Sequence, residues 1–260
     1  ELDRHEHDPA RRPPGRRRAP STSTPTGTPA LSRPAAGGEG GERYEIVLTS
    51  LGVPAVRDAV LGEVMHPVVG PSVESERLYV AQSRLADRLL QPGPALVLFD
   101  VGLGAAGNAM AAVRAARAAP PGSRPLVLVS FERELGALSL ACSDDGSRRL
   151  GWSAGETAAA RALLDGGRHE EPGLSWQLRL GEALDRLDAE PLRAEVVYWD
   201  PFSPKVNGEL WTAGAFARLA ARCATGATLF TYSTATATRS ALLLAGFAVG
   251  HGDASGPQEE

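Results

Sequence analysis

An acid and an aromatic residue stand close together in the segment YWDPFSP, residues 198–204. Asp200 ends an apolar run, and Phe202 lies two residues further on, between prolines that fix the backbone and remove hydrogen-bond donors. A carboxylate and nearby backbone carbonyls can accept hydrogen bonds from an amine while an aromatic ring stacks on a flat base. The segment therefore indicates a site for an amino group carried on a planar ring, with Asp200 and Phe202 at the reacting end.

A glycine-rich turn lies upstream, in the segment DVGLGAAGN, residues 100–108. Its GLGAAG run follows Asp100 and has the G-x-G-x-x-G spacing of dinucleotide-binding turns. Gly102 and Gly104 allow a ligand to approach the backbone closely, and a helix from Asn108 would present free N–H groups. The spacing alone leaves open a nicotinamide or flavin nucleotide, another adenosine ligand, or a turn that is rich in glycine for packing.

Two further carboxylates follow apolar runs. Glu132 ends the run LVLVSFE, where an acidic residue can accept hydrogen bonds from ribose hydroxyls. Glu182 follows LRLG and can accept from an adenine amino group. Each also has a simpler interpretation, Glu132 as a carboxylate favoured at a helix N-terminus and Glu182 as an exposed cap. We favour the ribose role for Glu132 because it complements the glycine turn.

The elements that position these residues alternate between strands and helices from residue 95 onward. Apolar runs typical of strands cover residues 95–100, 125–132, 174–180, 195–200, 226–233 and 247–250. Helical patterns lie at residues 109–119, from 133, and at 156–167, 182–188, 210–224 and 236–246. Apolar strands that alternate with helices predict a parallel sheet covered on both faces, with ligands beyond the carboxyl ends of the strands. Residues 95–260 are therefore predicted to form a doubly wound α/β domain.

Residues 42–94 are predicted to form a smaller extension made of a β-hairpin and a helix. Residues 44–50 and 54–60 have strand character and flank a short connection that contains glycine, which is typical of a hairpin. Residues 73–90 place apolar side chains near helical spacing and predict one helix. Ser72 is the expected N-cap of that helix.

Residues 1–41 differ from the rest because they are rich in Pro, Arg, Ser, Thr and Gly. Such a stretch buries too little apolar surface to offset its ordering entropy, so it is predicted to be disordered. Its arginines between Arg11 and Arg18 could touch RNA phosphates, although a solvated tail is the simpler interpretation. The sequence starts at Glu1 rather than Met and ends in a polar stretch, from which we expect a fragment.

The whole chain of 260 residues is 43% hydrophobic and carries a formal net charge of −4. It can bury one sizeable core, and its balanced charge does not by itself indicate a nucleic-acid partner. No apolar run approaches the length of a membrane span, and no signal-peptide pattern opens the chain. Cys142 and Cys223 lack C-x-x-C spacing. We therefore expect a cytoplasmic protein without a metal site, a disulfide framework or a membrane partner.

Together these stretches resemble the methyltransferase half of the MnmC tRNA-modification family, and more closely its stand-alone relatives without the oxidase half. The resemblance covers about residues 44–250, in GEVMHPVVGPSVESERLYV, DVGLGAAGN, VSFE, LGEAL, DPFSPKVNGELWT and GATLFTYSTATATRSALLLAGF. It implies a Rossmann-like fold with S-adenosylmethionine as cofactor. It also implies methylation of the primary amine of 5-aminomethyluridine, often 2-thiolated, at the tRNA wobble position. The implied partners are the tRNA anticodon stem-loop and a separate oxidase that supplies the aminomethyl substrate.

The resemblance also assigns residues to the site. Those expected around the cofactor are Asp100, Gly102, Gly104, Asn108, Glu132 and Glu182. Those expected on the substrate side are Asp200 and Phe202 at the amine, with Glu74, Arg77 and Lys205 in the surrounding wall. Methyl transfer from a sulfonium needs mainly alignment from the protein, so Asp200 would orient the amine and accept its proton.

The sequence departs from the family pattern in three places. Glu182 stands where Asp is more common, and Lys205 stands alone where a further basic residue is usual near Val206. Family members also continue past the GF segment into a strand that completes an antiparallel edge. We therefore expect the last edge strand of the sheet to be truncated.

Other functions remain open from the residues alone. A nicotinamide-dependent oxidoreductase would rest on G-x-G-x-x-G and would need a proton donor near the hydride site. His66 lacks an obvious partner, and a lone histidine is more often structural. A methyltransferase or aminopropyltransferase acting on a small amine would share the sheet, although no acidic polyamine pocket is evident. A non-catalytic tRNA-binding module would need a basic stripe, which the core lacks.

Overall fold

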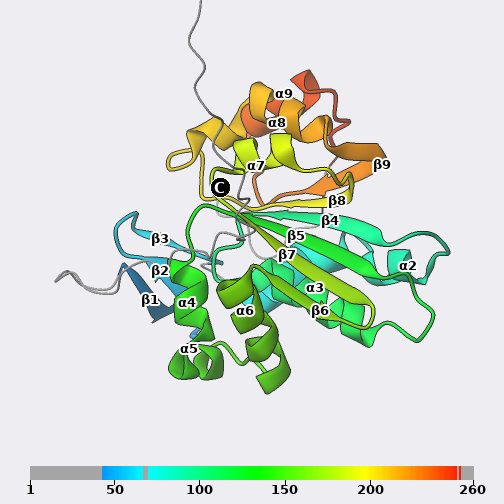
Figure 1. The fold of residues 1–260 in the computed structure, drawn as a ribbon. Helices are drawn as coiled ribbons and strands as arrows, with labels where there is room; N and C mark the ends of the chain where they lie inside the picture. Colours follow the sequence, from blue (N-terminus) through cyan, green and yellow to red (C-terminus); the bar gives the residue numbers. More distant parts are fainter. Residues whose placement is uncertain (1–42, 67–69, 251, 253–260) are drawn as a thin grey trace, which may run out of the picture. The chain divides into compact units, whose positions relative to one another are not determined.

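The computed structural model describes residues 43–66, 70–250 and 252 of the chain. Within them a six-stranded sheet carries helices on both faces, and a separate three-stranded sheet packs against helix α4 (Figure 1). The expectations for residues 1–41, including the arginines from Arg11 to Arg18, lie outside the described residues. All described residues belong to one compact unit, residues Gly41–Glu260.

The large sheet has the order β6-β7-β5-β4-β8-β9. Its strands are β4 Leu96–Val101, β5 Leu126–Glu132, β6 Arg168–Glu171, β7 Leu174–Leu180, β8 Ala194–Trp199 and β9 Cys223–Phe230. From β7 to β9 all neighbours run parallel, but β6 pairs antiparallel with β7. The prediction of a parallel sheet is therefore confirmed for its centre and wrong at this edge. The polar RHEE run has no apolar signal, and Pro172-Gly173 turns the chain back within two residues.

Helices cover the two faces of this sheet in separate groups. They are α3 Gly107–Ala118, α4 Gly136–Cys142, α5 Asp144–Arg149, α6 Ala154–Gly166, α7 Ala183–Ala189, α8 Ala213–Ala220 and α9 Thr236–Leu244, with a 3-10 turn η2 at Gly208–Trp211. In Figure 1, α7, α8 and α9 lie over one face, and α3 and α6 over the other.

Three sequence expectations about these elements are wrong. Helix α5 lies in the polar stretch between the helical patterns predicted from residue 133 and at residues 156–167, where no separate helix is predicted, and the side chain of Ser143 caps its first turn. The helix expected over residues 210–224 ends at Ala220, because Cys223 already begins β9. Residues 247–250 form no strand.

Side chains of the central strands alternate between two cores. On β4, Leu98 points into the core shared with α3 and α6, and Phe99 points into the core shared with α8 and α9. Trp176 and Trp199 are fully buried in opposite cores in the same way. Because both faces are covered, these strands are apolar throughout, and each fully buried side chain contributes roughly 1.5–3 kcal/mol.

The three-stranded sheet consists of β1 Tyr44–Leu48, β2 Pro54–Asp58 and β3 Glu63–Val64, all antiparallel. The predicted hairpin of β1 and β2 is confirmed, with Leu48 paired to Pro54. The ring of Tyr44 packs so closely on α4 that a Cβ at Gly136 would lie 2.5 Å from it. The first residue of α4 therefore has to be glycine for β1 to dock there.

Residues 73–90 do not form the single helix that their periodicity predicts. The chain forms α1 Pro71–Glu74, a π-helix η1 Ser75–Ala81, and α2 Leu85–Leu90. The N-cap is Gly70 rather than Ser72, and Arg84 adopts a left-handed conformation with φ 52° that separates η1 from α2. A local π-turn widens the helix and is common at functional sites, but its signal is hidden in an apolar pattern that suits an α-helix equally well.

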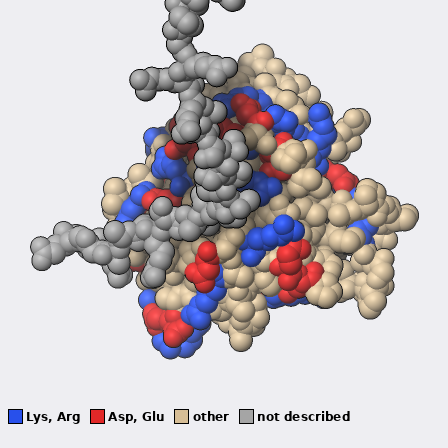
Figure 2. Space-filling model, viewed as in Figure 1, with Lys and Arg blue, Asp and Glu red and all other residues tan. Residues whose placement is uncertain are grey.

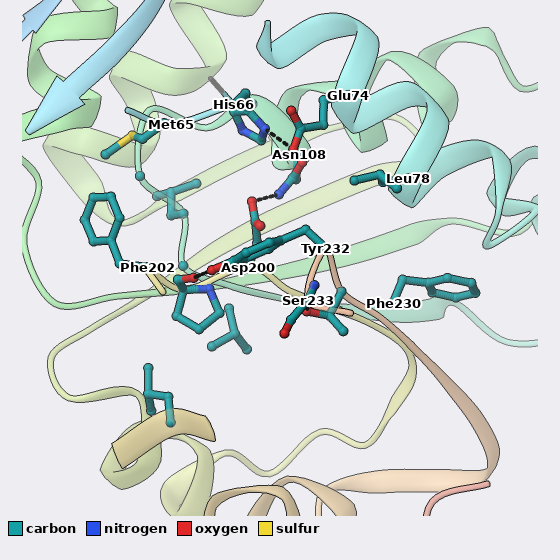
Figure 3. A pocket seen from close by; sticks show the side chains of 18 of the residues that line it. Met65, His66, Glu74, Leu78, Asn108, Asp200, Phe202, Phe230, Tyr232 and Ser233 are labelled. Atoms are coloured by element: carbon teal, nitrogen blue, oxygen red, sulfur yellow. Dashed lines mark hydrogen bonds and ion pairs between the residues drawn. The ribbon is translucent and has the colours of Figure 1, made fainter. Parts of the chain in front are cut away.

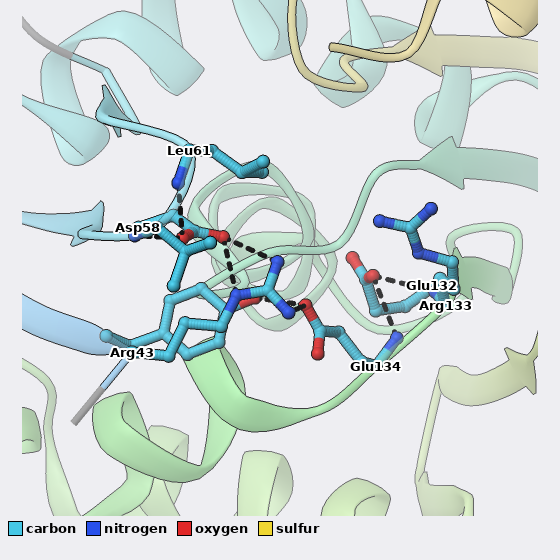
Figure 4. Close-up of polar contacts among 8 residues, drawn as sticks. Arg43, Asp58, Leu61, Glu132, Arg133 and Glu134 are labelled. Carbon is cyan, nitrogen blue, oxygen red and sulfur yellow. Dashed lines mark hydrogen bonds and ion pairs between the residues drawn. The ribbon is translucent and has the colours of Figure 1, made fainter. Parts of the chain in front are cut away.

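A buried ion pair fastens β2 to the residue before β1. Asp58 has no exposed side-chain surface and accepts hydrogen bonds from Arg43 Nε at 2.9 Å and Nη2 at 2.7 Å (Figure 4). Arg43 also lies 2.6 Å from Glu134 in the loop after β5. Burial acts to raise the pKa of Asp58, but the bonds from Arg43 and from the backbone amides of Leu61 and Val60 outweigh it and lower this pKa.

Asp58→Asn should destabilise the fold by roughly 1.5–3 kcal/mol near neutral pH, because it removes the buried charge that accepts hydrogen bonds from Arg43. Since the folded-state pKa of Asp58 is lowered, this contribution is present above the unfolded pKa of about 4 and is lost as pH falls further. Denaturant unfolding of both proteins at neutral and at acidic pH measures the difference. Glu45→Gln, which removes an exposed pair with Arg57, should leave the midpoint unchanged. Equal stability of Asp58→Asn and the parent at neutral pH would contradict the prediction.

Candidate active site

A cavity of about 1500 Å³ lies at the carboxyl ends of β4, β5 and β8. The wall of the cavity contains one residue from the end of each of these strands: Val101 of β4, Glu132 of β5 and Asp200 directly after β8. Met65, in the loop after β3, also lines the cavity. In open α/β sheets ligands bind at this end of the strands. The volume exceeds that of a usual single-ligand pocket, so a cofactor and a second reactant fit together.

The glycine turn between β4 and α3 forms one side of the cavity. Gly102 has φ +92°, and a Cβ there would lie 2.5 Å from the carbonyl oxygen of Asp200. The turn and the DPF segment are thus in direct backbone contact, which no other residue type allows. A Cβ at Gly107 would lie 2.9 Å from His66 Nε2, so the third glycine of the motif serves packing.

Glu132 joins the end of β5 to the glycine turn. Its Oε2 accepts from the N–H of Gly104 at 2.9 Å, and its Oε1 accepts from the N–H groups of Arg133 at 2.7 Å and Glu134 at 3.2 Å (Figure 4). Burial raises the pKa of Glu132, and the three donors oppose that rise. A carboxylate offers about four acceptor positions, so one remains for a ligand hydroxyl.

Asp200 is held by two donors from different elements. Its Oδ2 accepts from Asn108 Nδ2 at 2.6 Å (Figure 3), and its Oδ1 accepts from Tyr79 Oη at 2.7 Å. Ser75 in turn donates to Asn108 Oδ1 at 2.7 Å. Because its oxygen accepts from Ser75, the side-chain amide of Asn108 directs its NH₂ group at Asp200. Burial raises the pKa of Asp200, and His66, Tyr79 and Asn108 act in the opposite direction.

Sequence reasoning missed Ser75 and Tyr79. Both are fully buried and lie on the π-helix η1. The available signal was a pair of hydroxyl side chains inside the otherwise helical VESERLYV segment, at positions that helical periodicity turns inward. Tyr79 lies 121 residues from Asp200 in the sequence, so the contact itself had no local signature.

The DPF segment is fixed at three points around Asp200. The carbonyl of Pro201 accepts from Tyr232 Oη at 3.0 Å, and that of Phe202 accepts from Trp211 Nε1 at 2.9 Å. Ser203 donates to Glu63. The sequence predicts that these carbonyls bind the amine as well, but each already has a donor. The Asp200 carboxylate is thus the acceptor that this segment offers most readily.

His66 and Glu74 form a second polar pair in the wall. The distance from His66 Nδ1 to Glu74 Oε1 is 3.6 Å, and both side chains are largely buried (Figure 3). Burial acts to lower the pKa of His66, but Glu74 and Asp200 outweigh it, so this pKa is raised. The expectation that His66 lacks a partner is wrong, because its partner is contributed by α1.

Asp100 lies beneath the glycine turn and does not line the cavity. Its Oδ2 accepts from Ser130 Oγ at 2.8 Å, and Trp176 Nε1 donates to the same hydroxyl at 3.0 Å. Its Oδ1 is buried without a hydrogen-bond partner among the described residues. Burial raises the pKa of Asp100 to about 7. Asp100 therefore lies behind the turn and, unlike the position expected for it at the cofactor, offers no oxygen to the cavity.

The cavity unites most of the residues predicted from the sequence. Those that line it are Gly102, Gly104, Asn108, Glu132, Glu182, Asp200, Phe202 and Glu74. Glu182 is exposed at the start of α7, where its side chain makes no capping bond. Arg77 and Lys205 are exposed and do not line the cavity.

No group of three or more His, Cys, Asp or Glu side chains within the described ranges is placed to hold a metal ion. No helix in the same ranges is long and apolar enough to cross a membrane.

The groups that line the cavity fit S-adenosylmethionine. The glycine turn admits a ligand against the backbone, and Glu132 retains an acceptor position for a ribose hydroxyl. Glu74, Glu132 and Asp200 surround the cavity with negative charge, which suits a cationic sulfonium. The α/β fold and this site fit an S-adenosylmethionine-dependent methyltransferase.

Comparisons with known proteins agree with that class. Residues 167–260 match a family model described as S-adenosyl-L-methionine-dependent methyltransferase. The solved structure of MNMC2 from Aquifex aeolicus superimposes with a TM-score of 0.67 at 25% identity, covering 81% of this chain and 66% of that one. The chain therefore belongs to the S-adenosylmethionine-dependent methyltransferases, and the predicted cofactor is confirmed.

Within this class the chain is related to the MnmC proteins. The tRNA 5-methylaminomethyl-2-thiouridine biosynthesis bifunctional protein MnmC of Burkholderia vietnamiensis is 32% identical over 200 residues, which cover 72% of this chain and 30% of that protein. The protein of the same name from Ectopseudomonas mendocina is 32% identical over 189 residues, covering 68% and 28%. The chain thus spans less than a third of the length of these relatives.

Proposed function

We propose that the chain methylates the primary amine of 5-aminomethyluridine, with or without 2-thiolation, at the wobble position of tRNA. The product is the corresponding 5-methylaminomethyluridine. The observation that carries this proposal is the Asp200 carboxylate, which Tyr79 and Asn108 hold against the glycine turn in a cavity that Phe202 also lines. The names of the MnmC relatives support the choice of this nucleoside among possible amines.

The proposed chemistry needs a neutral amine. A free alkylamine resembles lysine, with a pKa of about 10.4, and is therefore mostly protonated near neutral pH. Asp200 attracts this ammonium group, orients it and takes one proton, which leaves the nitrogen lone pair free. Bound S-adenosylmethionine supplies an activated methyl group on a cationic sulfur. The protein contributes mainly alignment, with Phe202 stacked on the uracil ring and Glu132 on the ribose of the cofactor.

Recognition of the anticodon stem-loop needs contacts beyond the reacting amine. On the face shown in Figure 2, basic and acidic side chains of the described residues are interspersed. We therefore assign discrimination to the cavity, with Glu74 in its wall, and phosphate contacts to the exposed Arg77 and Lys205. A separate oxidase would supply the aminomethyl group, and the reaction would take place in the cytoplasm with the tRNA.

Nucleoside mass spectrometry of tRNA from cells with and without the gene tests the proposed substrate. Loss of the gene should abolish methylaminomethyluridine and lead to accumulation of aminomethyluridine. Re-expression of the parent chain, but not of the Asp200→Asn variant, should restore the methylated nucleoside. An unchanged nucleoside profile after gene loss would refute the substrate and favour a small amine in its place.

A further inference from the structure

Tyr79 contacts Asp200 across 121 residues of the sequence. Its ring is fully buried, and its hydroxyl donates to Asp200 Oδ1 at 2.7 Å. It reaches Asp200 from the π-helix η1, a rare conformation that persists where surrounding contacts compensate for it. Burial and the neighbouring Asp200 raise the pKa of Tyr79 well above its ordinary value, so the phenol keeps its proton near neutral pH and can donate to Asp200.

The second donor to Asp200 is equally constrained. Asn108 is 3% exposed, and its Oδ1 already accepts from Ser75. This bond turns the NH₂ group of Asn108 toward Asp200 Oδ2. Both carboxylate oxygens thus face a fixed donor, which favours the ionised form of Asp200 and defines the plane of the carboxylate.

The surroundings of Asp200 would otherwise oppose a negative charge. The charged or titratable groups that face it come from five elements: His66 after β3, Glu74 on α1, Tyr79 on η1, Asp100 on β4 and Tyr232 after β9. Burial and Glu74 favour its protonated form, whereas His66 and the two donors favour the carboxylate. Each hydrogen bond to Asp200 therefore affects the pH at which it can accept a proton.

We infer that Tyr79 is a positioning residue that holds the Asp200 carboxylate ionised and oriented toward the amine, with the Ser75–Asn108 pair as its second support. This inference rests on the proposed function of Asp200. Tyr79 itself does not touch the reacting atoms. Its contribution is to keep an anionic acceptor available in a buried site.

A neighbouring tyrosine provides a matched control. The ring of Tyr198 is also fully buried and lies 5.1 Å from that of Tyr79. Its hydroxyl is 3.0 Å from Ser83 Oγ and does not contact Asp200. Tyr79→Phe and Tyr198→Phe thus remove the same group from the same core, and they differ in the link to Asp200.

The first test compares kcat against pH for both variants, with tRNA that contains aminomethyluridine. Tyr79→Phe should lower kcat roughly tenfold near neutral pH and move its acidic limb about one pH unit upward, because a donor to the charged form is lost. The KM for S-adenosylmethionine should stay within about threefold. Tyr198→Phe should leave the profile in place. Coincident profiles for the two variants would overturn the inference.

A second readout needs no turnover. The chain is labelled with aspartate carrying ¹³C in the carboxyl group, and the Asp200 resonance is identified by its loss in Asp200→Asn. Tyr79→Phe should raise the titration midpoint of this resonance, and Tyr198→Phe should not. A midpoint that Tyr79→Phe leaves unchanged overturns the inference even if tRNA is methylated. A raised midpoint in a protein that does not methylate tRNA supports the inference and refutes the proposed function.

Thermal unfolding shows whether Tyr79→Phe remains folded. If it does not, Ser75→Ala replaces it, because this variant loosens Asn108 and leaves the tyrosine cluster intact. The titration midpoint of Asp200 should then rise in the same direction by a smaller amount. No rise with Ser75→Ala would overturn the claim that donors set the ionisation of Asp200.

Discussion

Replacing Asp200 with asparagine is expected to lower kcat for methyl transfer at least about a hundredfold. The variant keeps the size of the side chain but loses the negative charge that attracts the ammonium group and accepts its proton. The backbone carbonyls of Pro201 and Phe202 cannot readily replace it, because each already accepts a hydrogen bond from an aromatic side chain. The effect should therefore fall on the chemical step.

Single-turnover assays and calorimetric titration with S-adenosylmethionine separate the two effects in Asp200→Asn. The dissociation constant of the cofactor should change less than about threefold, since Glu132 is unaltered. Glu209→Gln is a suitable control because its exposed carboxylate also lines the cavity. It should retain the parental kcat. Normal turnover by Asp200→Asn would show that another group accepts the proton.

Glu132→Gln should weaken binding of S-adenosylmethionine by about 10- to 100-fold. The carboxylate is partly buried, bridges β5 to the glycine turn through Gly104, and has one acceptor position left for a ribose hydroxyl. Glutamine retains an oxygen for the backbone amides but lacks the charge and the second acceptor oxygen. The loss should appear mainly in cofactor affinity, and kcat at saturating cofactor should fall much less.

Calorimetric titration of Glu132→Gln with S-adenosylmethionine measures this loss, and thermal unfolding checks that the turn remains folded. Glu209→Gln is the matched control, since Glu209 lines the same cavity but is exposed. Its effect on affinity should be less than about threefold. Unchanged affinity in Glu132→Gln would refute the ribose assignment.

The centre of the sheet and its ligand end were predictable from local sequence. The apolar runs that become β4, β5 and β8 are too uniformly apolar for an exposed sheet, and they end in charged residues that mark the strand ends. Glu132 and Asp200 could therefore be placed at one edge before any contact was known. The pattern did not predict the order of the strands within the sheet, and the spacing of the glycine turn left its ligand open.

The supporting contacts were not predictable, because they depend on tertiary structure. The π-helix η1 and the left-handed Arg84 interrupt a segment whose apolar spacing fits an uninterrupted helix. Tyr79 finds its partner 121 residues away. Strand β6 is polar because it lies at an edge, so hydrophobicity could not reveal it. Asp100 lies near the end of β4, as the sequence predicts. Its pairing with Ser130 on β5, however, leaves its side chain buried behind the cavity.

The most direct test of the central claim uses the purified chain, S-adenosylmethionine and tRNA whose wobble uridine carries a 5-aminomethyl group. After incubation the tRNA is digested, and its nucleosides are quantified by mass spectrometry. We predict conversion of aminomethyluridine to methylaminomethyluridine with equimolar formation of S-adenosylhomocysteine, and no conversion with Asp200→Asn. Absence of the methylated nucleoside with the parent chain, at a cofactor concentration shown to saturate it, would contradict the proposed function.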